Sequence, residues 1–527
     1  MRKFFLLLTI MIFCGMNTAL AAEKIIFVPL DSRPITDRDT AMVGTKAGYE
    51  ILVPPNDILG TESSQGDTEK LWAWLNENAP NADAAVISTD SMIYGSLVAS
   101  RSHTLTNAEA QSKVMRFQKL RNDYPNLKIY AFGTVLRTLL TATHSAAGME
   151  PASYQANAVK IYKYSALLDK SEMNVASKRE IRELNRLEKD IDKEVMADWK
   201  NRHGINYNAN LKLMDLTKEG VFSFLLLGGD DSARFSATHR EARMIKDYAN
   251  AKNIERTKFQ MLSGADELGM MMLSRAILDM RGEVPFVHTI YNDGTGKDTL
   301  PSYCFETLGN EMKGAILALG AMEVPNQARA DFALLINTAI SGKTFEANSD
   351  KLNTKKSNSS VNAFMNKVKD ATDKGYPVIL ADISCSNGAD NALMEAMRKA
   401  NLQFKIRAYG GWNTATNTLG FLLGEGILTN YMTEKDRNEL MLYRYLDDWV
   451  YQSNIRQDLR SVISTLPGKG DPTGKTIGEK QAAAEKYTTD KILEFAKKNI
   501  NLPSNLSLNN LKVTFPWKRT FECEVFF

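Results

Sequence analysis

Residues 24–34 read KIIFVPLDSRP, and this stretch sets the pattern for the whole chain. An apolar run typical of a buried strand stops abruptly at Asp31, Ser32 and Arg33. Later apolar runs end in the same way, and helix-like stretches separate them. This alternation predicts parallel sheets with right-handed crossovers, in which the polar strand ends meet at one edge.

The length and composition indicate a large folded protein. With 527 residues the chain exceeds the size of one ordinary core, and 44% of its residues are hydrophobic. Lys and Arg total 65 and Asp and Glu total 62, which gives a formal net charge of +3. This balance gives no indication of a nucleic-acid partner or of binding to an anionic membrane surface.

The first 22 residues have the composition of a secretory signal. Arg2 and Lys3 precede an apolar run over residues 4–13, and small residues at Ala19 and Ala21 suit a cleavage site. The run is too short for a stable membrane anchor, and no later apolar run is long enough for a span. We therefore expect an exported protein, periplasmic or extracellular, without a membrane span after signal removal.

The order of the predicted elements divides the mature chain into three parts. We expect an α/β domain over residues 23–280, a second α/β domain over 281–427, and a helical extension with a terminal β-hairpin over 428–527. A strongly charged helical insertion is predicted over 151–215. Two halves built from Rossmann-like βα units fit this order, and a decorated (β/α)8 barrel is the alternative.

The C-terminal extension gives no direct indication of chemistry. Its helical pattern predicts that Asp447 and Asp448 lie on a solvated helix face. Trp517 and Phe521 near the end of the chain are expected to contribute to packing. The five histidines of the sequence show no spacing typical of a metal site.

Polar residues follow nearly every predicted strand. Asp, Ser and Asn often cap the next helix, but capping accounts for one small polar residue per helix. It does not account for Asp230 beside Asp231, or Asp266 beside Glu267, because like charges on a buried rim are costly without a proton, cation or ligand. The candidate site residues are Asp31, Arg33, Asp90, Arg137, Asp230, Asp231, Asp266, Glu267, Asp382, Asn387, Asp390, Trp412 and Asn413.

Seven motifs, in order along the chain, resemble a bacterial domain-of-unknown-function family, number 4127. They are PLDSRP, STDSMIYGSLVASR, GGDDSA, GADE, NGAD, GGWNTATNTLG and FPWKRTFE, and they extend over nearly the whole mature chain. One departure is Ser96, which stands where the family usually has a second glycine. The resemblance implies an exported protein, and it implies no known reaction, cofactor or catalytic residue.

The carboxyl and amide groups expected at the strand ends favour an exported hydrolase that acts on a carbohydrate, most simply a glycosidase. Glycoside cleavage needs one carboxyl group to donate a proton and another to activate water or attack carbon. We expect Asp266 and Glu267 to form the acid–base pair, with Asp230 or Asp231 as the second carboxylate. The remaining candidates are expected to bind the substrate, and Trp412 is suited to stack on a sugar ring. This reaction needs no cofactor.

Two alternatives remain open at this stage. A hydrolase of phosphoesters or amides could use Mg²⁺ or Ca²⁺ held by carboxylates such as Asp31, Asp90 and Asp382. A sugar- or solute-binding protein would also place two Rossmann-like halves around a polar cleft. In each case the partner is a small molecule or a glycan.

Overall fold

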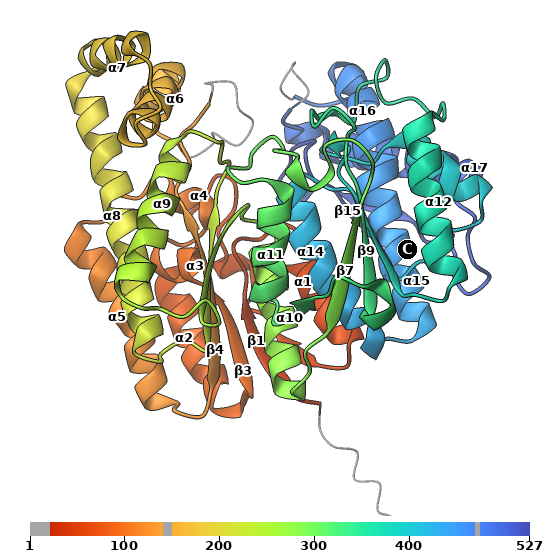
Figure 1. Cartoon of the computed structure of the whole chain (residues 1–527), viewed down its shortest axis with the longest axis horizontal. Coiled ribbons are helices and arrows are strands. Elements are labelled where there is room, and N and C mark those ends of the chain that lie inside the picture. Colours follow the sequence, from red (N-terminus) through yellow and green to blue (C-terminus); the bar gives the residue numbers. More distant parts are fainter. Residues whose placement is uncertain (1–21, 141–149, 470–474) are drawn as a thin grey trace, which may run out of the picture.

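Two parallel β-sheets stand side by side in the computed structural model, which describes residues 22–140, 150–469 and 475–527 (Figure 1). The strand order is β2-β1-β3-β4-β5-β6 in the first sheet and β13-β11-β9-β7-β8 in the second. The chain is therefore an α/β protein of two Rossmann-like halves, as predicted. The signal sequence predicted at the N-terminus lies, apart from its last residue, outside the described residues.

The first sheet is covered by helices on both faces. Its strands are β1 (Lys24–Val28), β2 (Glu50–Leu52), β3 (Ala84–Ser88), β4 (Lys128–Val135), β5 (Phe224–Gly229) and β6 (Phe259–Ser263). Its helices are α1 (Arg38–Lys46), α2 (Thr68–Asn78), α3 (Thr89–Ile93), α4 (Leu97–Ser100), α5 (Asn107–Asp123), α9 (Ala237–Ala251) and α10 (Leu268–Arg281). Burial on both faces explains why these strands are nearly continuous apolar runs.

The helical insertion connects β4 to β5. It contains α6 (Ala152–Glu172), α7 (Lys178–Asp190) and α8 (Lys193–Lys218). The long α8 packs on α5 and returns along the first sheet, whereas α6 and α7 extend beyond the end of the strands (Figure 1). A small apolar cluster that includes Tyr154 and Trp199 holds the three helices together.

The second sheet has β7 (Phe286–Tyr291), β8 (Met322–Glu323), β9 (Phe332–Asn337), β11 (Val378–Asp382) and β13 (Ala408–Gly410). Its helices are α11 (Leu308–Ala318), α12 (Ser359–Asp373), α13 (Asn391–Lys399) and α14 (Ala415–Leu428). Beyond the strand ends, β10 (Phe345–Glu346) pairs with β12 (Cys385–Ser386) in parallel. This short pairing joins two of the loops that follow β9 and β11.

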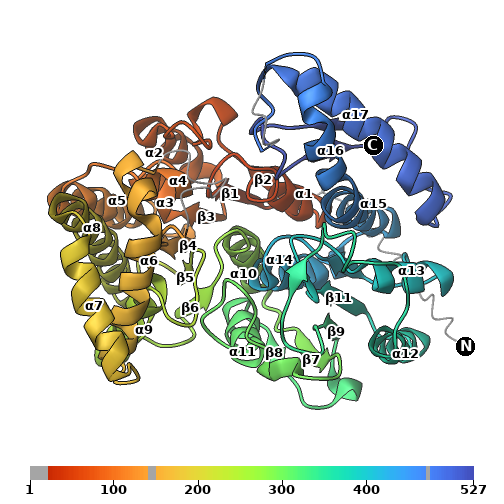
Figure 2. The ribbon, with the colours of Figure 1, turned by 90° about the horizontal axis from the view of Figure 1, so that it is seen from above.

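The C-terminal region packs against the second half on the side of α1 (Figure 2). It contains α15 (Glu434–Arg444), a π-helix (Tyr445–Ile455), α16 (Arg456–Val462), α17 (Gln481–Asn499) and the antiparallel pair β14 (Lys512–Thr514) and β15 (Glu524–Phe526). The expectation of a solvated face at Asp447 and Asp448 is wrong, because both are buried beside Arg444. An ion pair of 3.2 Å between Arg444 and Asp448 partly compensates that burial.

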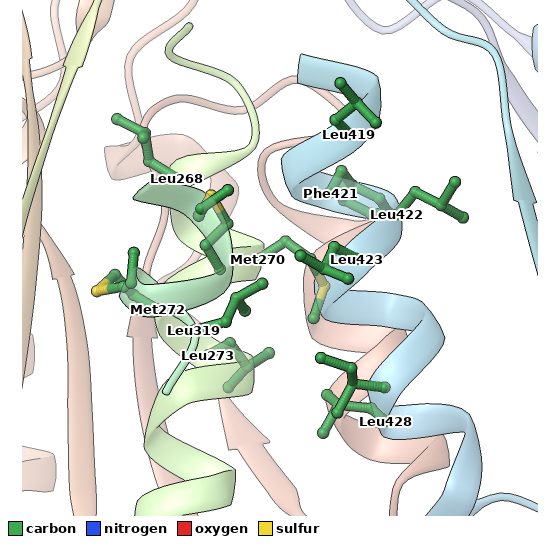
Figure 3. Packing of buried hydrophobic residues seen from close by; sticks show 14 of the residues in the cluster. Leu268, Met270, Met272, Leu273, Leu319, Leu419, Phe421, Leu422, Leu423 and Leu428 are labelled. Carbon is green, nitrogen blue, oxygen red and sulfur yellow. The ribbon is translucent and has the colours of Figure 1, made fainter. Parts of the chain in front are cut away.

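The two halves share one core, formed where α10 meets α14 (Figure 3). The helix α10 packs on β3 and β4, and α14 packs on β11 and β13. Met270 and Leu423 lie between the two helices, and other leucine and methionine side chains of the core surround them. At Gly420 a Cβ atom would lie 2.4 Å from Cγ of Glu267, so only glycine allows this close approach.

Candidate active site

A cavity of about 250 Å³ lies at the carboxyl ends of both sheets. Loops after the strands of the two sheets form most of its wall, and the C-terminal region forms the rest; we call it the central cavity. Its charged lining residues are Arg33, Glu62, Arg101, Arg137, Asp230, Asp231, Asp266, Glu346, Arg456, Arg460, Lys475 and Arg519. Polar strand ends from both halves therefore converge at one place, where ligands bind in α/β folds.

The charged group after β1 is an ion-paired unit that positions Arg33. Asp31 is fully buried and accepts hydrogen bonds from Nε and Nη2 of Arg33 at 2.9 and 2.8 Å. The same Nη2 donates to Oδ1 of Asp266 at 2.6 Å. Asp31 itself does not line the cavity. Its carboxylate, together with that of Asp266, holds the guanidinium of Arg33 in position.

Asp266 follows β6 and joins the two halves across the cavity floor. In addition to the Arg33 contact, its Oδ2 accepts hydrogen bonds from the side-chain amides of Asn413 at 2.9 Å and Asn417 at 3.4 Å. Burial raises the pKa of Asp266, the Arg33 charge opposes this, and the negative charges of Asp31 and Asp231 add to the rise. A raised pKa favours the protonated form of a buried carboxyl group.

Glu267, the neighbour of Asp266, does not line the cavity. It stands at the start of α10 with 1% of its surface exposed, and its side chain packs against Gly420 of α14. Its Oε2 has no hydrogen-bond partner among the described residues. Burial raises the pKa of Glu267 well above its ordinary value, which favours a protonated group beneath the cavity floor.

Asp230 and Asp231 follow β5 and have different surroundings. Nε and Nη2 of Arg101 donate three hydrogen bonds to the carboxylate of Asp230, at 2.7 to 2.9 Å. Both side chains are almost fully buried. The side chain of Asp231 is 30% exposed and lies 2.5 Å from Nη1 of Arg137. Arg137 also binds Glu150, so it is held from two directions. Asp231 is therefore the more accessible carboxylate of this pair.

Four further candidates lie behind the cavity wall. Asp90 accepts hydrogen bonds from the backbone and hydroxyl of Thr134, and burial raises its pKa to about 7. Asp382 is buried beside Asp390, and burial together with the charge of Asp390 raises its pKa to about 7. Asp390 caps the first turn of α13. Trp412 is 5% exposed and belongs to the shared core, so its ring is not presented to the cavity.

Two asparagines supply amide groups to the lining. Asn387 and Asn413 both adopt positive φ, 59° and 57°, a left-handed conformation that asparagine tolerates better than most residues. Asn387 donates to Glu346 at 3.0 Å, and its backbone nitrogen donates to the carbonyl of Asn413 at 2.8 Å. The loops after β12 and β13 are thereby locked to each other at the cavity.

The C-terminal region supplies lining residues that the sequence patterns did not single out. Arg456 and Arg460 come from α16, and Lys475, Trp517, Arg519 and Phe521 come from the segments that follow. Trp517, expected only to pack, donates from Nε1 to Oγ of Ser32 at 3.0 Å. Its ring lies against the guanidinium groups of Arg33 and Arg519. The motif FPWKRTFE, with its clustered aromatic and basic residues, was the available signal.

The described residues contain no group of three or more His, Cys, Asp or Glu side chains arranged to hold a metal ion. Within the same ranges no helix has the length and apolar character needed to cross a membrane. The three described cysteines, Cys304, Cys385 and Cys523, are buried free thiols.

Comparison with known proteins identifies a family without an assigned activity. A family model described as "Protein of unknown function (DUF4127)" matches residues 25–526. No curated protein matches the sequence. The function therefore has to be argued from the central cavity itself.

Proposed function

The chain belongs to the DUF4127 family, and we propose that it is an exported hydrolase acting on a carbohydrate bound in the central cavity. In this proposal Asp266 is the general acid and Asp231 is the second carboxylate. The observation that carries it is that both side chains line the same cavity and that the charge of Asp231 contributes to the raised pKa of Asp266. Two carboxyl groups in different surroundings are what glycoside cleavage requires.

The surroundings of the two groups suit different roles. Asp266 is buried and its pKa is raised, so it can deliver a proton to the glycosidic oxygen as the bond breaks. Asp231 carries the negative charge of its ion pair with Arg137 and is partly exposed, so it can attack the anomeric carbon or take a proton from water. Asp230 is clamped by Arg101 and serves to position the loop.

The rest of the lining suits a sugar. The amides of Asn387 and Asn413 can exchange hydrogen bonds with hydroxyl groups, and Tyr303 and Phe521 are partly exposed rings in the wall. Aromatic side chains offer flat apolar surfaces of the kind that sugar rings pack against. These residues take the place that the sequence patterns gave to Trp412.

The test is turnover of a panel of 4-nitrophenyl glycosides, neutral and uronic, by the full mature protein. We expect release of 4-nitrophenol from at least one member, its loss in Asp266→Asn and Asp231→Asn, and no effect of EDTA. Asp298→Asn is the control, because Asp298 is exposed and is not among the residues that line the cavity. Full activity in Asp266→Asn would contradict the proposal, and so would activity that EDTA abolishes and Mg²⁺ or Ca²⁺ restores.

One observation favours a second candidate, a binding protein for a small solute. The carboxylates Asp230, Asp231 and Asp266 each have an arginine partner, an arrangement that also suits recognition without proton transfer. Tight sugar binding by calorimetry, unchanged in Asp266→Asn and without turnover of any glycoside, would select this candidate.

A further inference from the structure

Arg456 is an almost fully buried arginine whose hydrogen-bonding capacity is largely unused. It begins α16, lines the central cavity and is 2% exposed. Its Nε and Nη1 atoms have no hydrogen-bond partner in the described part of the chain, and Nη2 makes one long contact of 3.4 Å to the carbonyl of Asn387. An arginine normally has five N–H donors to satisfy, so most of those of Arg456 remain available to a ligand.

Arg460 lies one helical turn further along α16 and lines the same cavity. Its Nε donates to the hydroxyl of Thr520 at 2.9 Å, and neither Arg460 nor Arg456 has a carboxylate within ion-pair distance among residues 22–140, 150–469 and 475–527. Burial and the neighbouring charge of Arg460 lower the pKa of Arg456 to about 10, and burial lowers that of Arg460. Two like charges four residues apart on a helix repel each other.

Packing alone does not explain this pair. The guanidinium of Arg456 lies 5.4 Å from the ring centre of Phe521, a contact that compensates only part of the cost of burying a charge. Glu346, a carboxylate of the lining whose charge acts on both arginines, accepts hydrogen bonds from Asn387 and makes no ion pair with either arginine. A buried charge without a partner is costly in the free protein and is compensated when an anion binds.

We propose that Arg456 and Arg460 form a subsite for an oxyanion of the ligand, either a carboxylate or a phosphate or sulfate group. The planar forks of two guanidinium groups match the geometry of such oxygens. The anion subsite itself does not depend on the proposed function. If that function is accepted, the substrate is an anionic sugar, such as a uronic acid or a phosphorylated or sulfated sugar. A neutral glycan would leave both arginines unpaired.

The experiment measures anion binding without relying on turnover. Isothermal titration calorimetry of the mature protein uses inorganic phosphate, sulfate, D-glucuronate and D-glucose as probes, with ionic strength held constant by NaCl. We expect saturable binding of phosphate or sulfate, or of glucuronate, and none of glucose. The preferred probe distinguishes a phosphate or sulfate group from a carboxylate.

Substitutions assign the binding to the two arginines. Arg456→Met is expected to weaken the preferred anion about tenfold or more, and Arg460→Met by less, because loss of a charge-assisted hydrogen bond costs that much in affinity. Arg456→Lys, which keeps the charge, should recover part of the binding. Arg329→Met is the matched control, because Arg329 is an exposed arginine far from the cavity lining.

Two results would overturn the subsite: no probe binds beyond the effect of NaCl, or Arg456→Met binds the preferred anion as tightly as the unchanged protein. Failure of the hydrolase proposal has a different signature. In that case the anion still binds, Arg456→Met still weakens its binding, and no glycoside of the panel is cleaved.

Discussion

The arginines on two sides of the central cavity differ in how they are partnered. On the side of the first sheet, Arg33, Arg101 and Arg137 each hold at least one carboxylate at 2.5–2.9 Å. On the side of α16, Arg456 and Arg460 hold none in the described chain. The first arrangement fixes the shape of the wall, whereas the second leaves donors for a molecule that enters. Burial does not distinguish these arginines; what distinguishes them is whether their N–H donors already have partners within the protein.

The largest expected effect is on kcat, and it tests whether Asp266, which is ion-paired with Arg33, is also a catalytic residue. Asp266→Asn keeps the size of the side chain and an oxygen that can accept from Arg33, but its NH2 group cannot accept from Asn413 and Asn417 in place of Oδ2. The amide also cannot donate the proton that the leaving group needs. We expect kcat to fall about 10²- to 10⁴-fold on any glycoside that is cleaved, with a small change in KM. Steady-state kinetics over a range of substrate concentrations measures both.

A variant on the α16 side of the central cavity provides the comparison for Asp266→Asn. Arg456→Met should raise KM more than it lowers kcat if α16 binds the anionic part of the substrate. If Asp266→Asn altered only KM, Asp266 would be a binding residue and the two sides would not differ in role.

The next effect concerns stability and needs no ligand. Arg101→Met removes the partner of buried Asp230, and we expect it to lower the free energy of unfolding by about 3–5 kcal/mol. Arg456→Met removes an unpaired buried charge and should leave stability unchanged or raise it. Urea unfolding followed by circular dichroism compares the two. Equal losses of stability would show that the presence of a carboxylate partner does not distinguish Arg101 from Arg456.

The opposite imbalance occurs around Arg444, where carboxylates outnumber the arginine. Asp39, Asp448 and Glu425 all lie near it, and burial raises the pKa of Glu425 to about 8. The folded protein holds this proton up to about pH 8, whereas the unfolded chain releases it above about 4.5. Stability therefore falls as pH rises through this range, by at most about 3 kcal/mol from this group between pH 4.5 and 7.

Glu425→Gln tests that dependence. The variant should lose less stability than the unchanged protein between pH 5 and 8, measured as the melting temperature in a series of buffers. Glu434→Gln is the control, because Glu434 is exposed on α15 and should leave the slope as it is. An unchanged slope in Glu425→Gln would show that the carboxyl group is already compensated in the fold.

The smallest effect concerns the contact that joins the two sides. Trp517→Phe removes the hydrogen bond to Oγ of Ser32 and keeps an aromatic ring near Arg33. We expect a loss of about 1 kcal/mol in stability. Ser32→Ala also removes the hydrogen bond from its hydroxyl to the carbonyl of Gly60, so it should cost at least as much, and the double variant little more than Ser32→Ala alone. Additive losses would mean that this hydrogen bond contributes nothing.

Much of the architecture could be predicted from the sequence. Apolar runs that end in polar clusters gave parallel sheets, because strands buried on both faces must be continuous and their loops must meet at the carboxyl edge. Of the candidate site residues, Arg33, Arg137, Asp230, Asp231, Asp266, Asn387 and Asn413 line the central cavity. Each comes directly after a strand, or within a few residues of its end.

The remaining candidates depended on tertiary packing that no local pattern contains. Glu267 and Asp266 are neighbours in sequence, yet the start of α10 directs one beneath the floor and the other into the cavity. Arg456 and Arg460 have the spacing of a solvated helix face, and only the packing of α16 against the π-helix and α17 at the cavity buries Arg456 and half-buries Arg460. Asp447 and Asp448 were misjudged for the same reason.

The contact of α10 with α14 at Gly420 has a consequence for how the molecule can be divided. Because α10 packs along α14 in the shared core, a fragment that ends after α10 would expose side chains such as Met270 to water. The halves should consequently melt in one cooperative transition, and separately expressed halves should aggregate. The strand ends that line the central cavity are then held in fixed positions, and the two halves do not open and close about a hinge.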